Sequence, residues 1–314
     1  MKLKTKEKLR DLTVKLALNL RGEIFKVWGE IGLRNICGTA ASGDVTFKID
    51  EIAERCLEKF FKKADLPIAY FSEDRGLINP NDDSEFILIV DPIDGTRAAI
   101  AGLETCCVSV AVAPFSEDVK LCDVFSATLV EIKSGSVLSG VIGEGVKYYA
   151  PDGKVKDAFP SNKKELKGML WAFEIAGRPA NAVISALDDL IDRTSLQGGC
   201  FIFNSASFAL SRVALGQLDA YIDIMGEILK KTPGLARRIK TTFEGKMGML
   251  HFYDVAAAIP LVQTAGCTVT DADGNSLDNW SLFEKGDRTF KSCICSSNER
   301  LHQNILQYFR GKGF

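Results

Sequence analysis

Two aspartates three positions apart, Asp91 and Asp94, are the side chains of this sequence best placed to do chemistry. They directly follow the apolar run 86–90 and flank a proline that fixes one backbone φ angle. Carboxylates at the end of a buried strand repel each other and lose hydration, so they stay ionised only beside cations. Their oxygens suit Mg²⁺, which suits phosphate, and Gly95 and Thr96 offer backbone N–H groups at a helix start, where anions bind well. The segment predicts a metal-assisted phosphate site.

Two further acids stand at comparable positions. Glu73 follows a predicted strand over 67–71, and Asp254 lies at the start of a helix predicted over 253–265. Taken singly, each acid is also typical of a helix cap or a solvated turn. Their combination with the first pair indicates a carboxylate-rich site.

The elements that must position these acids form a mixed pattern. Apolar residues at helical spacing predict helices over 4–28 and from Ile49 onwards, separated by a Gly- and Ser-rich loop over 29–43. Strands over 105–113, 124–132 and 137–142 and a hairpin over 143–153 follow one another without helices, which favours an α+β fold over a βαβ array. Further strands are predicted over 86–90, 169–175, 219–223, 267–270 and 293–296, and further helices over 179–191, 204–215 and 298–309. We expect an N-terminal α+β part over 1–150, with the metal-binding strand ends, and a C-terminal α/β part over 151–314, with the last metal ligand.

Composition argues against several other classes of protein. The 314 residues are 46% hydrophobic and 25% charged, and a net charge of −2 gives no field that would attract nucleic acid or an anionic membrane. No apolar run has the length of a membrane span, and residues 1–8 are charged, so we expect a cytoplasmic chain without a signal peptide. The nine cysteines form no C-x-x-C pair, which favours reduced core residues, and only two histidines are present, which argues against His-rich zinc sites and Ser-His catalysis.

Two motifs carry a resemblance to a known family. Asp91-Pro-Ile-Asp-Gly-Thr96 and Tyr253-Asp-Val-Ala-Ala257 are similar to the D-P-I/L-D-G-T and W-D-x-A-A/G signature of the inositol monophosphatase / fructose-1,6-bisphosphatase superfamily. Weaker matches extend over nearly the whole chain, at 45–50, 72–74, 173–178, 219–223 and 265–274. The resemblance implies a layered αβαβα sandwich, a Mg²⁺-dependent and lithium-sensitive phosphatase, and a homodimer.

The resemblance also implies a ligand set of two or three Mg²⁺ ions. Glu73 and Asp91 would bind one ion together with the backbone carbonyl of Ile93. A second ion would be bound by Asp91, Asp94 and Asp254, and a third, weaker one would lie near Glu73. Two such ions can hold an attacking water and a leaving oxygen in line.

The remaining implied roles concern the proton and the substrate. Thr96, hydrogen-bonded to Asp50, would take a proton from water, so that both act in catalysis together with Glu73. Backbone N–H groups of Gly95 and Thr96 would bind the phosphate. Substrate hydroxyls or phosphate would be contacted by Glu174, Arg178 and Asp223, and Arg97 is a further candidate.

Departures from the family pattern are also informative. Ser72 and Asp74 replace a glycine and a glutamate of its G-E-E motif, and Tyr253 replaces its tryptophan. The segment 226–250 is longer than usual and carries a charge of +4, from six Lys or Arg residues minus two Glu residues. We hypothesise that it covers the site and selects an anionic, even bisphosphorylated, substrate; a solvated surface insertion or a subunit contact is the alternative.

The leading function is therefore Mg²⁺-dependent hydrolysis of a small sugar or polyol phosphate, inositol-1-phosphate and/or fructose-1,6-bisphosphate. Alternatives are a phosphatase for adenosine 3′,5′-bisphosphate or NADP, and a non-catalytic protein that binds a phosphorylated metabolite. A haloacid-dehalogenase-type phosphatase is disfavoured because that class needs D-x-D, and the spacing here is D-x-x-D.

Overall fold

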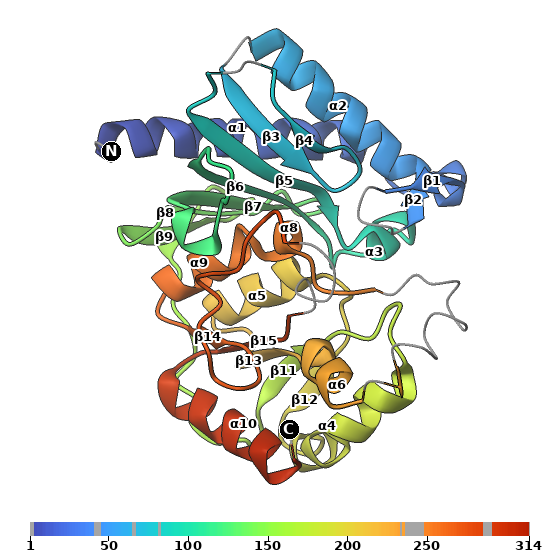
Figure 1. Ribbon diagram of the computed structural model, residues 1–314, viewed down its shortest axis with the longest axis vertical. Coiled ribbons are helices and arrows are strands. Elements are labelled where there is room, and N and C mark those ends of the chain that lie inside the picture. Colours follow the sequence, from blue (N-terminus) through green and yellow to red (C-terminus); the bar gives the residue numbers. More distant parts are fainter. Residues whose placement is uncertain are drawn as a thin grey trace.

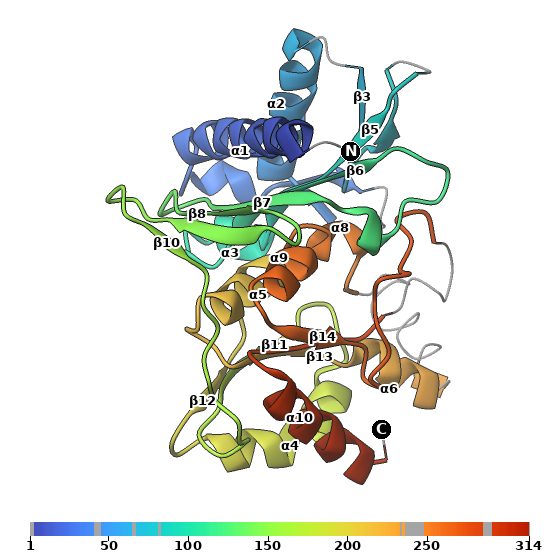
Figure 2. The same ribbon diagram turned by 90° about the vertical axis from the view of Figure 1, so that its left-hand side faces the viewer.

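The protein is built of five alternating layers of helices and strands (Figure 1). The structure, a computed structural model, describes residues 3–40, 45–64, 67–80, 83–232, 234–235, 248–284 and 291–313. Two long helices cover an eight-stranded sheet, a middle layer of helices separates it from a five-stranded sheet, and further helices cover the far face (Figure 2). The α+β class and the αβαβα sandwich are thereby confirmed.

The larger sheet supplies most of the site. Its strands lie in the order β10 (Val155–Asp157), β9 (Gly145–Tyr149), β8 (Val137–Val141), β7 (Ser126–Glu131), β6 (Cys107–Pro114), β5 (Phe86–Asp94), β3 (Ile68–Ser72) and β4 (Gly76–Ile78). Only β3 and β5 run parallel; the other neighbours are antiparallel. The succession of strands predicted between 105 and 153 is therefore present.

The smaller sheet is mixed. Its order is β12 (Gly199–Phe201), β11 (Leu170–Phe173), β13 (Ala220–Asp223), β15 (Cys293–Ser296) and β14 (Thr268–Thr270). The first three strands run parallel and the last two antiparallel to their neighbours. A separate short ribbon pairs β1 (Ile36–Thr39) with β2 (Val45–Phe47).

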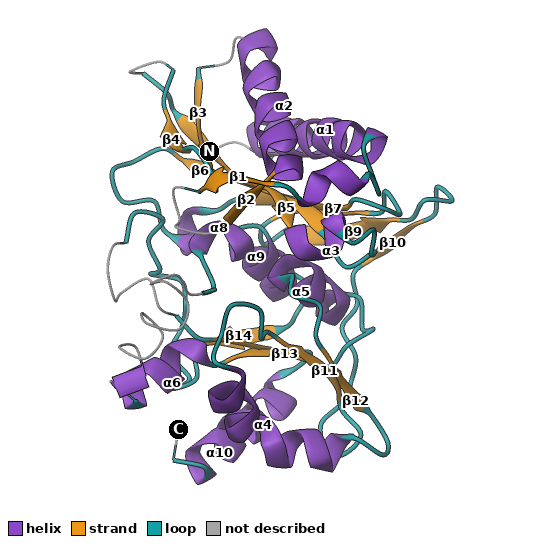
Figure 3. Cartoon of the chain, turned by 90° about the vertical axis from the view of Figure 1, so that its right-hand side faces the viewer, coloured by secondary structure: helices purple, strands orange, loops and turns teal. Residues whose placement is uncertain are grey.

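The helices form three layers, as Figure 3 shows beside the sheets. The first layer holds α1 (Leu3–Lys26) and α2 (Lys48–Ala64), and the short α3 (Thr96–Ile100) follows β5. The middle layer holds α5 (Ala206–Ala214), α8 (Phe252–Val255) and α9 (Ala258–Thr264). The last layer holds α4 (Ala180–Thr194), α6 (Met225–Lys231) and α10 (Glu299–Gly311).

Three apolar clusters fill the spaces between the layers, and β5 belongs to two of them. Leu88 and Val90 pack in the cluster beneath α1 and α2, whereas Ile87 and Ile89 pack in the cluster that faces the middle helices. The alternation follows from the twofold side-chain period of a strand. The apolar run is thus buried on both faces, as predicted.

Several local expectations are wrong. The loop predicted over 29–43 contains a turn of 3₁₀ helix and β1, and neither β12 nor α6 was expected. The helix predicted over 253–265 is broken between α8 and α9, because Pro260 cannot donate to the carbonyl of Ala256 and its ring clashes there.

The division expected after residue 150 stays a prediction. β10 continues the first sheet to Asp157, and the middle helices, which come from the C-terminal part, lie between the two sheets.

None of the helices in the described residues is long and apolar enough to cross a membrane.

Candidate active site

An irregularity in β5 brings Asp91 and Asp94 onto one face. Asp91 pairs with Ser109 and Asp94 with Cys107, so three steps along β5 match two along β6. A regular strand would point two residues three positions apart to opposite faces, and one extra residue restores a common face. Both carboxylates therefore belong to the face that carries Ile87 and Ile89, towards the middle helices.

The start of α5 holds one of these carboxylates. The Ser205 hydroxyl donates to Asp94 Oδ2 at 2.9 Å, and the Ser207 backbone N–H donates to the same oxygen at 2.5 Å. Ser205 is also the N-cap of α5 and accepts a hydrogen bond from the Phe208 N–H. The sequence predicts the helix over 204–215, but its pattern does not reveal the contact of these serines with Asp94.

The α8 helix brings the last acid to the same cavity. The His251 backbone N–H donates to Asp254 Oδ2 at 2.7 Å, and the Ser207 hydroxyl donates to the Asp254 carbonyl at 2.6 Å. Val255, Ala256 and Ala257 are fully buried, so the end of α8 and the turn after it lie close against their neighbours. One serine-rich helix start therefore contacts two acids that are far apart in the sequence.

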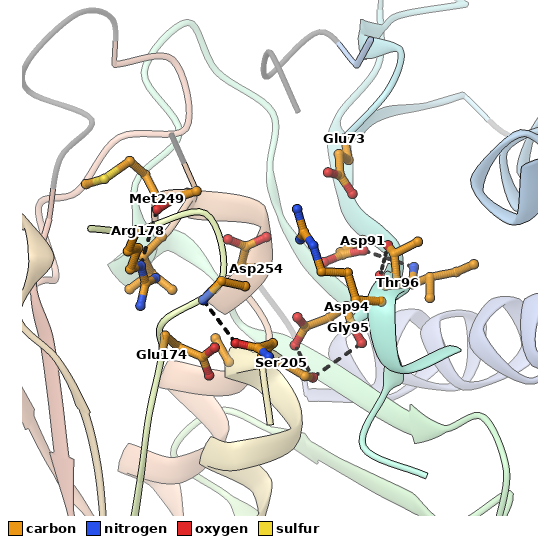
Figure 4. A pocket seen from close by; sticks show the side chains of 17 residues that line it. Glu73, Asp91, Asp94, Gly95, Thr96, Glu174, Arg178, Ser205, Met249 and Asp254 are labelled. Carbon is orange, nitrogen blue, oxygen red and sulfur yellow. Dashed lines mark hydrogen bonds between the residues drawn. The ribbon is translucent and has the colours of Figure 1, made fainter. Parts of the chain in front are cut away.

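Glu73 and these three aspartates line one cavity between the layers. Figure 4 shows Glu73, Asp91 and Asp94 along one side and Asp254 across from them, with Glu174 and Arg178 beyond. The cavity encloses about 620 Å³, counted with its open mouth. Within the described residues no three His, Cys, Asp or Glu side chains are grouped closely enough to hold a metal ion as they stand.

The electrostatics of the acids fit a divalent cation. Burial first, and then the charges of Glu73, Asp94 and Asp254, raise the pKa of Asp91 well above its usual value. Burial likewise raises the pKa of Asp94 to about 6, although hydrogen bonds from Ser205 and Ser207 oppose the shift. Ionised carboxylates here need a positive partner, and hard oxygen donors suit Mg²⁺ or a similar ion.

The left-handed Gly95 links Asp94 to α3. It has φ +91°, and a Cβ at this position would lie 2.8 Å from the Thr105 carbonyl oxygen. Thr96 follows as the first residue of α3, and its hydroxyl donates to the Ile93 carbonyl at 3.1 Å. Gly95, Thr96 and Ile93 all line the cavity.

Asp50 lies on α2 behind Thr96 and does not line the cavity itself. It accepts a hydrogen bond from the Phe47 N–H at 2.8 Å. Burial raises the pKa of Asp50 to about 7, against the effects of the Phe47 hydrogen bond and of the nearby Thr96 side chain. Asp50 and Thr96 are therefore neighbours, but the Thr96 hydroxyl donates to the Ile93 carbonyl, and its expected hydrogen bond to Asp50 stays a prediction.

The far side of the cavity contains a buried charged pair. Arg178 Nη2 lies 2.6 Å from Asp223 Oδ2, and Arg178 Nε donates to the Gly248 carbonyl at 3.2 Å. Asp223 also accepts from the Met225 N–H at 3.0 Å, and it lies behind Arg178 and not on the cavity wall. Arg178 and Glu174 are the two side chains of this group that face the cavity.

Glu174 and Arg178 each have a polar atom that a ligand could bind. Among the described residues, Glu174 Oε1 and Arg178 Nη1 are buried and have no hydrogen-bond partner. Burial raises the pKa of Glu174 to about 8, which favours the protonated carboxyl, and a protonated carboxyl can donate a hydrogen bond to an oxygen. Arg97, the further arginine named from the sequence, also lines the cavity.

The basic segment 226–250 divides into parts with different surroundings. Its first residues belong to α6, where Ile228 and Leu229 are buried in the last apolar cluster. Lys230 pairs with Glu227 and Asp273, away from the cavity lining. At the other end Gly248, Met249 and Leu250 line the cavity, and residues 236–247, with Arg237, Arg238, Lys240 and Lys246, lie outside the described residues.

Comparisons with known proteins agree with this geometry. The profile of the inositol monophosphatase family matches residues 6–313. The chain is 26% identical over 303 residues to a fructose-1,6-bisphosphatase/inositol-1-monophosphatase of Methanothermobacter thermautotrophicus, with 95% of each chain covered. It is also 26% identical over 317 residues to a bifunctional NADP phosphatase/NAD kinase of Methanococcus maripaludis, covering 94% of this chain and 49% of that longer protein.

A solved structure, the IMPase of Thermotoga maritima, is similar with a TM-score of 0.70 and 18% identity, covering 97% of each chain. At this identity the similarity shows the fold alone. The family profile, in contrast, extends over almost the entire sequence. This chain therefore belongs to the inositol monophosphatase family and is a phosphoric monoester hydrolase.

Proposed function

We propose that the protein hydrolyses a small sugar or polyol phosphate, inositol-1-phosphate and/or fructose-1,6-bisphosphate, with Mg²⁺ as its cofactor. The observation that carries the proposal is the placement of Glu73, Asp91, Asp94 and Asp254 around one cavity beside Gly95. Relatives named for both substrates support it. Sugar phosphates also fit the mixed lining, which has carboxylates on one side and polar groups on the other.

The metal side would be formed by the four carboxylates and the Ile93 carbonyl, which would hold two or three Mg²⁺ ions. When bound, these ions supply positive charge that activates water and stabilises the leaving oxygen. The protein's own part is to hold its carboxylates in place. One oxygen of Asp94 is fixed by Ser205 and Ser207, and one oxygen of Asp254 by the His251 N–H.

Thr96 and Asp50 would take up the proton that the attacking water loses. Thr96 lines the cavity, and Asp50 is a neighbour of Thr96 that does not line it. A pKa of about 7 for Asp50 is suited to accepting a proton near neutral pH. The backbone N–H groups of Gly95 and Thr96 would orient the phosphate.

The substrate side would be recognised by Glu174 and Arg178. Their buried groups without partners, Glu174 Oε1 and Arg178 Nη1, cost free energy until a ligand satisfies them. A hydroxyl or a phosphate oxygen of the substrate can accept from both at neutral pH. Asp223 would act through Arg178, which it holds in place.

Several further properties are proposed from the family resemblance. These are inhibition by Li⁺, assembly as a homodimer and a cytoplasmic location, and the nine free thiols are compatible with a reducing compartment. The covering role of the basic segment also stays a prediction, for the residues beyond the described part.

A panel of phosphate-release assays tests the proposal. Inositol-1-phosphate, fructose-1,6-bisphosphate, NADP and adenosine 3′,5′-bisphosphate are each incubated with the protein, with Mg²⁺ and with EDTA. We expect Mg²⁺-dependent release that is fastest with one of the first two. Preference for NADP would instead favour the alternative suggested by the bifunctional relative. Binding without release of phosphate from any of the four would indicate a non-catalytic binding protein.

A further inference from the structure

Glu54 is a buried acid that the proposed function leaves without a role. It lies on α2, one helical turn after Asp50, and only 2% of its surface is exposed. It does not line the cavity, so it is not a direct ligand of anything bound there. A carboxylate is seldom this buried unless its oxygens have specific partners.

The partners of Glu54 lie on both sides of Glu73. The Ser72 hydroxyl donates to Glu54 Oε2 at 3.0 Å, and the Asp74 backbone N–H donates to Glu54 Oε1 at 3.4 Å. One carboxylate therefore binds the residue before and the residue after the expected ligand. Glu73 itself, between them, lines the cavity.

The turn that carries Glu73 is held at two further points. Asp74 Oδ1 accepts a hydrogen bond from the Thr46 hydroxyl at 2.8 Å, which ties the turn to β2. Arg75 Nε lies 3.2 Å from Glu58 Oε1, four residues after Glu54 on α2.

Three acids of α2, spaced by four residues, therefore face this region: Asp50, Glu54 and Glu58. Residues at this spacing lie above one another on one face of a helix. The outer pair, Glu58 with Arg75, is partly exposed and contributes little. The hydrogen bond from Ser72 to Glu54 is buried and is the stronger restraint, because water cannot replace it.

We propose that Glu54 is a positioning residue that clamps Ser72 and Asp74 so that the intervening Glu73 carboxylate points into the metal-binding cavity. The inference rests on the proposed function, because it takes Glu73 as a metal ligand. Hydrogen-bonded partners that orient a ligand affect metal affinity without touching the metal.

Mn²⁺ binding to the metal-free full-length chain, followed by EPR of the unbound ion, tests the proposal without using activity. We expect Glu54→Ala to raise the dissociation constant about 10- to 100-fold, the usual effect of losing such a partner. Glu54→Gln should bind Mn²⁺ nearly as wild type, because its amide oxygen can accept from the Asp74 N–H while its NH₂ donates to Ser72 Oγ. Glu51→Ala is the matched control, since Glu51 lies on the same helix and pairs with Lys48 at the surface.

The outcomes separate the clamp from other roles. A folded Glu54→Ala protein that binds Mn²⁺ with wild-type affinity overturns the proposal. A Glu54→Gln protein that binds Mn²⁺ as weakly as Glu54→Ala also overturns it, because the charge of Glu54 and not its hydrogen bonds would then determine the affinity. Should Glu54→Ala fail to fold, Ser72→Ala decides: a dissociation constant raised about tenfold supports the clamp, and an unchanged one refutes it.

A Glu73→Gln arm distinguishes this inference from the proposed function. Weaker Mn²⁺ binding in Glu73→Gln together with normal binding in Glu54→Ala rejects only the clamp. Normal binding in Glu73→Gln shows that Glu73 is not a ligand, and the ligand set of the proposed function then fails as well.

Discussion

Replacing Gly95 by alanine tests whether the close packing around this residue, at the end of β5, leaves no room for a side chain. Gly95 has φ +91°, and an added Cβ would lie 2.8 Å from the Thr105 carbonyl oxygen and 2.9 Å from Ser205 Cβ. The left-handed backbone alone costs a non-glycine residue about 1–2 kcal/mol. Because the contacts involve backbone and a buried side chain that cannot swing away, overpacking adds about 1–3 kcal/mol. We therefore expect Gly95→Ala to lose about 2–5 kcal/mol.

Gly102→Ala is the matched control for this experiment. Gly102 has φ +74°, so it carries a similar backbone penalty, but nothing lies within 4 Å of its added Cβ. It should lose only the backbone part, about 1–2 kcal/mol. Urea unfolding of both variants in EDTA gives the free energies of unfolding, and equal losses would refute the crowding argument. Because relief of the clash must move Gly95 away from Ser205, the variant should also bind metal more weakly.

Three further predictions address the acids, the buried pair and pH. Asp94→Asn should stay folded and lose turnover, since it removes a negative ligand, and phosphate release at wild-type rates would exclude that role. Arg178→Ala should cost about 3–5 kcal/mol in urea unfolding because Asp223 is left buried and unpaired, and Arg178→Ala/Asp223→Asn should recover part of the loss. Burial lowers the pKa of His302 to about 4. As the pH falls, the unfolded state therefore protonates His302 before the folded state does, and the free energy of unfolding decreases between about pH 6.5 and pH 4. The His302→Gln substitution should remove about 3 kcal/mol of this decrease. Parallel pH profiles of the two proteins would contradict the prediction.

The sequence predicted the elements better than their junctions. The apolar run 86–90 and the strands that follow depend on local composition, and they were located within a few residues. The extra residue between Asp91 and Asp94 depends on pairing with β6, which no local pattern reveals. The break in the 253–265 helix was readable in principle, because Pro260 marks it, but alanines around it favoured one continuous helix.

The site shows the same division. Asp91, Asp94 and Glu73 stand at strand ends, so their common location could be argued from the sequence. The partners of Asp223 could not, because a buried pair with Arg178 requires β13 and the residues after β11 to be adjacent. The role of Ser205 could not be predicted either, since its contact with Asp94 joins residues 111 positions apart.

The three aspartates share an arrangement that explains how the fold prepares the cavity. One oxygen of each carboxylate accepts a backbone N–H: from Ile93 for Asp91, from Ser207 for Asp94 and from His251 for Asp254. Backbone donors cannot rotate away, so each carboxylate is oriented when the chain folds and not when a ligand arrives. An asparagine at such a position can keep the backbone hydrogen bond through its oxygen, but it then presents an NH₂ group where a cation would need an oxygen. Substitution by asparagine at each of the three positions should therefore leave the protein folded but weaken its metal binding.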